Sequence, residues 1–366
     1  MTEGLGEQTT RTVRLSGRIA SRTDPNRELR AKVLSLLFAD GWNVYNSNGD
    51  QRITLGNVQL KIVECDAFVF MPGAALEDFF KAISILVGYQ TLDPFLKHKP
   101  ALLLNPDGSW DGLFELLDDM QRLGTVHQPY RQYLLQADDP EDLIYRLRVS
   151  TVEGVPRVER ARIAPEGSTP TTRVLGDGDR GRPRVCVFCS AFIEDASYLI
   201  DGYHLGKRIA EANWGCVSGA GTTGAMGSVV RGSVEAGGWT AGSNVPHIIE
   251  LEGLPEGLIE FWPRPDIYTR MEVMIAESDA FVIFPGGAGT IQEVLALLLF
   301  KEVDDPVVRG KPIVLFNRLN PDGKTRFWDR LLRLLGLLSN LDSLLIVDDL
   351  EDIVPSLRPL IERGMY

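Results

Sequence analysis

The chain has 366 residues, of which 44% are hydrophobic and 24% are charged, and its formal net charge is −12. This length predicts about two domains, each large enough to bury its own core. The negative charge argues against a broad nucleic-acid-binding surface, although it is compatible with a small phosphorylated ligand. The N-terminal stretch lacks the apolar core of a signal peptide, and no apolar run is long enough for a membrane helix, so we expect a cytoplasmic protein.

Two distant parts of the sequence share one pattern, in which a buried strand breaks into a turn and then a helix. "ECDAFVFMPG" (residues 64–73) matches "ESDAFVIFPG" (residues 277–286), and "KPALLLNPDG" (residues 99–108) matches "KPIVLFNRLNPDG" (residues 311–323). Two matches in the same order indicate an internal duplication.

The stretch between the two copies, residues 150–183, is rich in Gly, Pro, Thr and Arg and has no apolar periodicity. Such composition is typical of a linker or a meandering surface segment. We therefore predict one domain over residues 1–149, a linker over residues 150–183 and a second domain over residues 184–366.

Short apolar runs alternate with helical patterns in the second half. In chain order, strands are predicted near residues 185–189, 216–218, 239–242, 281–284, 313–317 and 344–347, and helices at residues 196–212, 224–236, 268–277, 290–300 and in the leucine-rich stretch after Trp328. This alternation is typical of an α/β fold, a doubly wound parallel sheet with helices on both faces. Ligands bind such sheets at the carboxyl ends of the strands, where the glycine-rich turns of this sequence fall.

The four cysteines are Cys65, Cys186, Cys189 and Cys216. They are too few and too scattered for a disulfide scaffold, and no second ligand pair stands at zinc-site spacing from the C-x-x-C pair. We expect all four to be buried core thiols.

The first glycine-rich turn, "SGAGTTGAMGSVVRGSVEAGG" (residues 218–238), follows a predicted strand and opens a helix. Its glycines let a ligand approach the backbone, and free amides at the start of the helix can hold an anion. The alternative is a tight turn that only allows close packing of the helix. The candidate binding residues here are Gly219, Gly221, Thr222, Gly224, Met226 and Gly227.

The second turn, "PGGAGTIQE" (residues 285–293), offers the amides of Gly286, Gly287 and Gly289 and the hydroxyl of Thr290. Successive amides in such a turn form a nest for phosphate, and the helix dipole favours the negative charge. Glu293 stands one turn later, so its carboxylate can reach the same mouth. The alternative is a simple carboxylate at a helix terminus.

An arginine precedes the second turn, on the predicted helix in "RPDIYTRMEVMIAESDAF". Ile267, Met271 and Met274 form the apolar stripe of this helix, and Arg270 lies at its edge. From there Arg270 can reach a substrate, although a surface ion pair with Glu272 or Glu277 is the alternative.

Together these motifs resemble the LOG ("Lonely Guy") family, the cytokinin-activating nucleoside 5′-monophosphate phosphoribohydrolases often mislabelled as lysine decarboxylases. "VFCSAF" is similar to the family's VFCGSS, "GAGTTGAMGSV" to GGGxxGLMGxV, and "PGGAGTIQE" matches PGGxGTxxE in full. The sequence departs from the family at three positions: Met271 replaces a lysine, Gln292 replaces a glutamate and Ala220 replaces a glycine. The resemblance implies two tandem Rossmann-like sheets, the first a degenerate copy of the second.

The resemblance also implies hydrolysis of the N-glycosidic bond of a cytokinin riboside monophosphate or an AMP-like nucleotide, giving free base and ribose 5-phosphate. Glu293 would stabilise the oxocarbenium-like transition state, Arg270 would orient the substrate, and the glycine turns would hold the 5′-phosphate. We expect no cofactor and assign no metal ligand, since no lysine stands in a pattern that suggests pyridoxal phosphate. A non-catalytic nucleotide-binding or sensing protein is the main alternative, and single-stranded DNA binding suits the net charge poorly.

The first copy lacks the residues that carry this chemistry. The positions of Gly287, Gly289, Thr290 and Glu293 hold Ala74, Leu76, Glu77 and Phe80, and the position of Arg270 holds Asn57. We therefore expect the first copy to be inactive, with side chains filling the nest and Glu77 repelling phosphate. Family members form homodimers, so the chain is expected to form either a homo-oligomer or an internal pseudo-dimer; a regulatory or scaffolding role for the first copy is the alternative.

Overall fold

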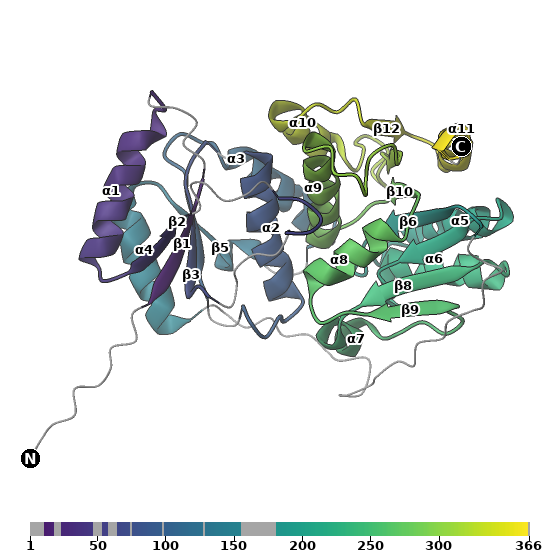
Figure 1. The fold of residues 1–366 in the computed structure, drawn as a ribbon, viewed down its shortest axis with the longest axis horizontal. Helices are drawn as coiled ribbons and strands as arrows, with labels where there is room; N and C mark the ends of the chain where they lie inside the picture. The colour runs from purple at the N-terminus through teal and green to yellow at the C-terminus, as the bar shows by residue number, and fades with distance from the viewer. Residues whose placement is uncertain are drawn as a thin grey trace, which may run out of the picture.

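The computed structural model describes residues 11–17, 23–46, 53–57, 64–73, 75–96, 99–126, 129–154 and 181–364. Two separate parallel sheets form, one from each half of the chain (Figure 1). The fold class predicted from the sequence is therefore confirmed. Residues 155–180, which make up most of the predicted linker, lie outside the described residues.

The first sheet has five parallel strands in the order β2-β1-β3-β4-β5. Its strands are β1 (Thr12–Ser16), β2 (Asn43–Asn46), β3 (Ala67–Phe70), β4 (Ala101–Leu104) and β5 (Leu134–Ala137), and a short 3-10 helix, η1 (Tyr130–Gln132), precedes β5. Alternate residues of β3 point to opposite faces, as the pleat requires. Val69 packs in a cluster with α1 (Asn26–Ala39) and α4 (Pro140–Glu153), whereas Phe68 packs in a cluster with α2 (Leu76–Gln90) and α3 (Asp111–Arg122).

The second sheet has seven parallel strands in the order β12-β11-β10-β6-β7-β8-β9. The strands are β6 (Arg184–Phe188), β7 (Gly215–Ser218), β8 (Thr240–Asn244), β9 (Glu260–Pro263), β10 (Ala280–Ile283), β11 (Ile313–Phe316) and β12 (Leu344–Val347). The helices are α5 (Ala196–Glu211), α6 (Gly224–Glu235), α7 (Pro246–Glu252), α8 (Ile267–Ala276), α9 (Ala288–Glu302), α10 (Asp329–Leu338) and α11 (Ile353–Gly364), with a 3-10 turn η3 (Leu350–Asp352) before the last. Each predicted strand and helix of this half is present within a few residues, whereas β9, α7 and α11 were not predicted.

The strand order shows what the two copies share. The order β2-β1-β3-β4-β5 corresponds to β7-β6-β10-β11-β12, with the helix pairs α2/α9 and α3/α10 at equivalent places. The second sheet continues through β8 and β9, which have no counterpart among the described residues of the first half. The connection from β2 to β3 spans only residues 47–66, whereas the equivalent connection spans residues 219–279 and holds α6, α7 and α8. This connection is too short to hold counterparts of the first glycine-rich turn and of α8. The predicted match of Asn57 to Arg270 is therefore wrong, because Asn57 lies in a turn closed by its N–H to the Thr54 carbonyl oxygen and not on a helix.

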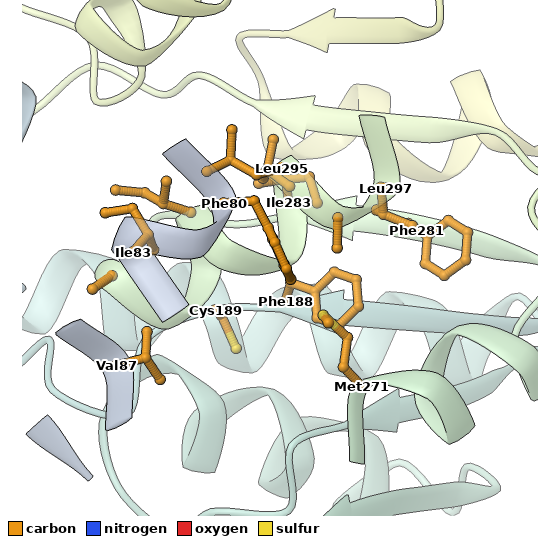
Figure 2. Packing of buried hydrophobic residues seen from close by; sticks show 14 of the residues in the cluster. Phe80, Ile83, Val87, Phe188, Cys189, Met271, Phe281, Ile283, Leu295 and Leu297 are labelled. Carbon is orange, nitrogen blue, oxygen red and sulfur yellow. The ribbon is translucent and has the colours of Figure 1, made fainter. Parts of the chain in front are cut away.

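The two halves pack through their equivalent helices, α2 against α9 and α3 against α10. Figure 2 shows Phe80, Ile83 and Val87 of α2 beside residues of the second half, and one hydrophobic cluster runs across both halves. Every residue of α2 except Glu77 is buried, as expected for a helix that is apolar on most sides and enclosed between layers.

Polar contacts join the same surfaces. The Gln292 Nε2 atom donates to the Ser84 Oγ atom at 2.9 Å, between α9 and α2. The backbone N–H of Leu55 donates to the Asp305 carboxylate at 3.0 Å. Arg330 of α10 forms ion pairs with acidic residues of α3. Because several of these groups are buried, the halves are held together by packing and by satisfied hydrogen bonds.

Candidate active site

One pocket lies at the carboxyl ends of β6 and β10, where the fold places ligand sites. Residues from six segments line it: the loop after β6, the first turns of α6 and α9, the helices α7 and α8, and the end of α2 from the other half. The lining residues are Val87, Gln90, Thr91, Cys189, Ser190, Ala191, Phe192, Met226, Ile248, Glu252, Arg270, Gly287, Ala288, Gly289, Thr290, Gln292 and Glu293.

The turn from β10 into α9 places a threonine, Thr290, in the wall of this pocket. A Cβ atom at Gly286 would lie 2.0 Å from the Thr290 Oγ1 atom, so only glycine leaves room for that side chain. Thr290 is 2% exposed, and its hydroxyl has no hydrogen-bond partner among the described residues. A buried hydroxyl without a partner is costly. Because Thr290 lies in the first turn of α9 and lines the pocket, its hydroxyl is suited to bind an anionic ligand.

Glu293 lies one turn further along α9 and is 8% exposed. Burial raises the pKa of its carboxyl to about 8, while the Arg270 guanidinium lowers it and the Glu252 carboxylate raises it. Burial dominates because a charged carboxylate loses its hydration in this environment. Glu293 therefore binds a proton near neutral pH, and it can both accept and release one there.

Arg270 is held on α8, which begins at Asp266, whose carboxylate accepts from the backbone N–H groups of Tyr268 and Thr269. The guanidinium donates to the carbonyl oxygen of Ser243 at 2.9 Å and to that of Gly219 at 3.3 Å. These carbonyls fix the side chain at the pocket.

The surface ion pair considered as the alternative for Arg270 is not what the structure describes. Its guanidinium donates to the two carbonyls, and Glu277 pairs with Arg184 at 2.6 Å instead. A Cβ atom at Gly219 would lie 1.9 Å from the guanidinium, so that glycine makes room for Arg270.

The first glycine-rich turn shapes the site from behind. The hydroxyl and the backbone N–H of Thr222 both donate to the Glu252 carbonyl, so this hydroxyl is engaged away from the pocket. A Cβ atom at Gly227 would lie 2.0 Å from the Thr222 carbonyl oxygen, which requires glycine there. Ala220, where the family motif has glycine, adopts a left-handed φ of 53°, a conformation that costs a non-glycine residue energy.

The predicted site residues thus divide into two groups. Those that line the pocket are Met226, Gly287, Gly289, Thr290, Arg270 and Glu293. Those that do not line it are Gly219, Gly221, Thr222, Gly224, Gly227 and Gly286. In the second group the glycines allow close approach of a side chain or a carbonyl, as for Gly224, where a Cβ atom would lie 2.5 Å from the Ala191 carbonyl carbon.

The polar pocket residues that the sequence reasoning did not assign to the site include Glu252, Gln90 and Thr91. Glu252 is 4% exposed, and its carboxylate lies where a Cβ atom of Gly221 would approach within 2.8 Å. It ends the short helix α7, which has no long apolar period to reveal it. Gln90 and Thr91 belong to the other half of the chain, so only the packing of α2 on α9 places them here.

All four cysteines are buried and free, which confirms the prediction of buried thiols. Cys189 also lines the pocket. Burial raises the pKa of its thiol well above the usual value, so the thiol stays protonated and is a poor nucleophile.

The equivalent turn in the first copy holds different side chains among its described residues. Phe80, at the position of Glu293, is fully buried in the core shared by the two halves. Glu77 pairs with Lys81 at 2.5 Å. The expected repulsion of phosphate by Glu77 is thus weakened by its own ion pair, and the change from Glu293 to Phe80 is the larger loss. Ala74 lies outside the described residues.

Within the described ranges, no group of three or more His, Cys, Asp or Glu side chains is arranged to hold a metal ion. No helix in the same part of the chain has the length and apolar character needed to span a bilayer.

Comparison with known proteins gives a consistent picture. The family model described as "Possible lysine decarboxylase" matches residues 60–147 in the first half and residues 226–352 in the second. A "Probable cytokinin riboside 5′-monophosphate phosphoribohydrolase" of Oryza sativa subsp. japonica is 35% identical over 150 residues, which cover 41% of this chain and 57% of the rice protein. This chain therefore spans little more than half of that relative.

A "Cytokinin riboside 5′-monophosphate phosphoribohydrolase" of Mycobacterium tuberculosis is 30% identical over 179 residues, covering 48% of this chain and 93% of the mycobacterial protein. Among solved structures, the Moco carrier protein of Chlamydomonas reinhardtii shares 21% identity with a TM-score of 0.39, over 50% of this chain and 99% of its own. With the family model matched in both halves and nearly the whole mycobacterial protein aligned, this chain belongs to the "Possible lysine decarboxylase" family, the LOG family whose motifs it carries.

Proposed function

We propose that this protein hydrolyses the N-glycosidic bond of a nucleoside 5′-monophosphate and releases free base and ribose 5-phosphate. Its similarity to proteins named as cytokinin riboside 5′-monophosphate phosphoribohydrolases supports this reaction. The single observation that carries it is the set of groups at the first turns of α9: a buried hydroxyl without a partner, Thr290, next to a buried carboxyl, Glu293, that faces Arg270.

The phosphate would bind at the start of α9. Gly287 and Gly289 line the pocket with their backbone at the positive end of the helix dipole, and the Thr290 hydroxyl adds a donor. The formal charge of the whole chain is negative, so a local arrangement of donors has to supply this affinity. Binding of the phosphate would then position the sugar over Glu293, since a remote anchor can lower the barrier at the reacting centre.

The bond cleavage would depend on Glu293. As the C1′–N bond breaks, positive charge develops on the sugar, and an ionised carboxylate stabilises it. The same carboxylate would take a proton from the water that attacks C1′, for which a pKa of about 8 is well placed. The base leaves with the electron pair of the broken bond and takes up one proton.

Arg270 and Glu252 would complete the polar side of the site. Arg270 would orient the substrate from α8, held by two backbone carbonyls. Glu252 is a second carboxylate on the same pocket, and it would hold ribose hydroxyls, which are hydrogen-bond donors.

The first half would act as the partner of the second. Equivalent helices of the two copies pack against each other, as they would across the two-fold axis of a homodimer. We propose that the chain is an internal pseudo-dimer with one active copy, over residues 184–366, and one inactive copy, over residues 1–149.

The test is a panel of nucleoside 5′-monophosphates incubated with the wild type, Glu293→Gln and Arg270→Ala, with free base and ribose 5-phosphate separated by chromatography. We expect product with the wild type only, while calorimetry shows that Glu293→Gln still binds the nucleotide. Binding by the wild type without product would favour a nucleotide sensor. Full activity in either variant would contradict the proposed roles.

A further inference from the structure

A chain of two hydrogen bonds between α9 and α2 fixes the orientation of Gln292. This residue precedes Glu293 on α9, lines the pocket and is 5% exposed. Its Nε2 atom donates to the Ser84 Oγ atom at 2.9 Å, and Ser84 Oγ donates to the Phe80 carbonyl oxygen at 2.7 Å. A hydroxyl has one proton, and that of Ser84 is used within α2. Ser84 therefore accepts a hydrogen bond from residue 292 and has no proton left to give it.

This arrangement requires an amide at position 292, where the LOG family motif has glutamate. An ionised carboxylate only accepts hydrogen bonds. At this position it would face the lone pairs of Ser84 Oγ, or it would draw the hydroxyl proton away from the Phe80 carbonyl. Glutamine supplies the missing N–H, and the direction of that bond leaves Oε1 as the other end of the amide.

The Oε1 atom of Gln292 is an acceptor on the side of the pocket. Within the described ranges of the chain, no group donates a hydrogen bond to it. The fully enclosed side-chain atoms without a partner include the Thr290 hydroxyl but not this oxygen, so Oε1 keeps contact with the pocket space. Gln292 thus offers a neutral acceptor beside the carboxyl of Glu293.

We infer that Gln292 positions the attacking water through its Oε1 atom, together with the Glu293 carboxylate, and that Ser84 of the inactive half fixes Gln292 in this orientation. A water molecule has two protons and can donate one to each of these oxygens. Its lone pair is then held in one direction, toward C1′, which is how orientation lowers a barrier. This inference rests on the proposed function, because that reaction supplies the step.

The step accounts for both protons of the water. Its oxygen bonds to C1′ as the C1′–N bond breaks, and the base leaves with the electron pair of that bond. One water proton passes to Glu293 and balances the proton that the base takes up. The other stays in the new hydroxyl of ribose 5-phosphate, bonded to Gln292 Oε1. Methanol has a single O–H, so it could serve Glu293 only by turning its methyl group toward Oε1, which leaves that acceptor without a donor.

The experiment measures the competition between water and methanol as nucleophiles. The panel nucleotide that the wild type cleaves fastest is incubated at a fixed methanol concentration, and ribose 5-phosphate is separated from its methyl glycoside by chromatography. The variants are Gln292→Met, which keeps most of the side-chain volume but not the acceptor, and Ser84→Ala and Ser84→Thr. Gln136→Met is the matched control, because Gln136 lies in β5, donates to Asp138 and does not line the pocket.

We expect the ratio of methyl glycoside to ribose 5-phosphate to rise by about 5-fold or more in Gln292→Met, with kcat lower by about 10-fold and KM within about 2-fold of the wild type. Ser84→Ala frees the amide to turn, so it should raise the ratio by a smaller factor. Ser84→Thr keeps the hydroxyl and should stay near the wild-type ratio, as should the control.

An unchanged ratio in both Gln292→Met and Ser84→Ala, while the nucleotide is still cleaved, would overturn this inference and leave the proposed function standing. A residue that only supports the fold would change stability without changing this ratio. If Gln292→Met does not fold, the comparison of Ser84→Ala with Ser84→Thr decides. Absence of cleavage by the wild type would overturn the proposed function and this inference together.

Discussion

Replacing Glu293 by glutamine should stabilise the protein. The folded state holds this carboxyl with a pKa of about 8, whereas the ordinary value is 4.5. A carboxyl with a raised pKa keeps its proton in the folded state over a range in which the unfolded chain has lost it. The free energy of unfolding therefore decreases as the pH rises from the ordinary pKa of 4.5 to the raised pKa of about 8, and it does not decrease further at higher pH.

The magnitude follows from the distance between the two pKa values. One pH unit between them corresponds to about 1.4 kcal/mol, so the penalty is about 3 kcal/mol near pH 7 and about 5 kcal/mol well above pH 8. Near pH 5 it is below about 1 kcal/mol, because that pH lies only about half a unit above the pKa of the carboxyl in the unfolded chain. Glutamine has nearly the same shape and no charge, so Glu293→Gln should remove the penalty at every pH.

The assay is chemical unfolding followed by tryptophan fluorescence, for which the chain has six tryptophans. Wild type and Glu293→Gln are compared near pH 5, 7 and 9, and Glu256→Gln serves as a control because Glu256 is exposed. We expect the advantage of Glu293→Gln to grow with pH, while the control stays within about 0.5 kcal/mol of the wild type. An advantage that does not change with pH would refute the raised pKa.

Three further predictions follow from the same geometry. Because the ionised form of Glu293 is the catalytically active one in this mechanism, kcat/KM should rise with pH to a plateau above about 8. A decrease of kcat/KM in that pH range would indicate that Glu293 instead donates a proton. Gly287→Ala should weaken the contact between the halves, because its Cβ would lie 2.3 Å from the Thr125 carbonyl oxygen. Gly289→Ala meets no atom within 4 Å, so its free energy of unfolding should rise by up to about 1 kcal/mol. Equal stability of the two variants would argue against this packing. Ser84→Ala should lower the free energy of unfolding by about 1–3 kcal/mol, because the buried Gln292 amide loses its hydrogen-bond acceptor. Ser84→Thr keeps a hydroxyl and should lower it less.

Much of the second half could be predicted from the sequence because its signals are local. One strand-to-helix turn, residues 285–293, contains the glycines, the hydroxyl of Thr290 and the carboxylate of Glu293. Their proximity therefore follows from chain geometry alone. The edge strand β9 was missed because it is four residues long and ends in proline, and α7 because it has only seven residues.

What the sequence could not reveal depends on contacts between distant parts of the chain. Thr222 stands in a motif that predicts a ligand contact, but its hydroxyl bonds to the carbonyl of Glu252, thirty residues away. Gln90 has no motif around it and belongs to a copy that we expected to be inert. Its place in the pocket results from the packing of α2 on α9, which buries apolar surface that neither half can bury alone.

The most direct test of the central claim is the stoichiometry of AMP cleavage by the full chain. The account predicts adenine and ribose 5-phosphate in equal amounts, with no adenosine and no inorganic phosphate, and loss of both products in Glu293→Gln. Adenosine with inorganic phosphate would show that the phosphate ester is cleaved instead, and unchanged AMP after binding would show that the site does not catalyse hydrolysis; either result would contradict the account.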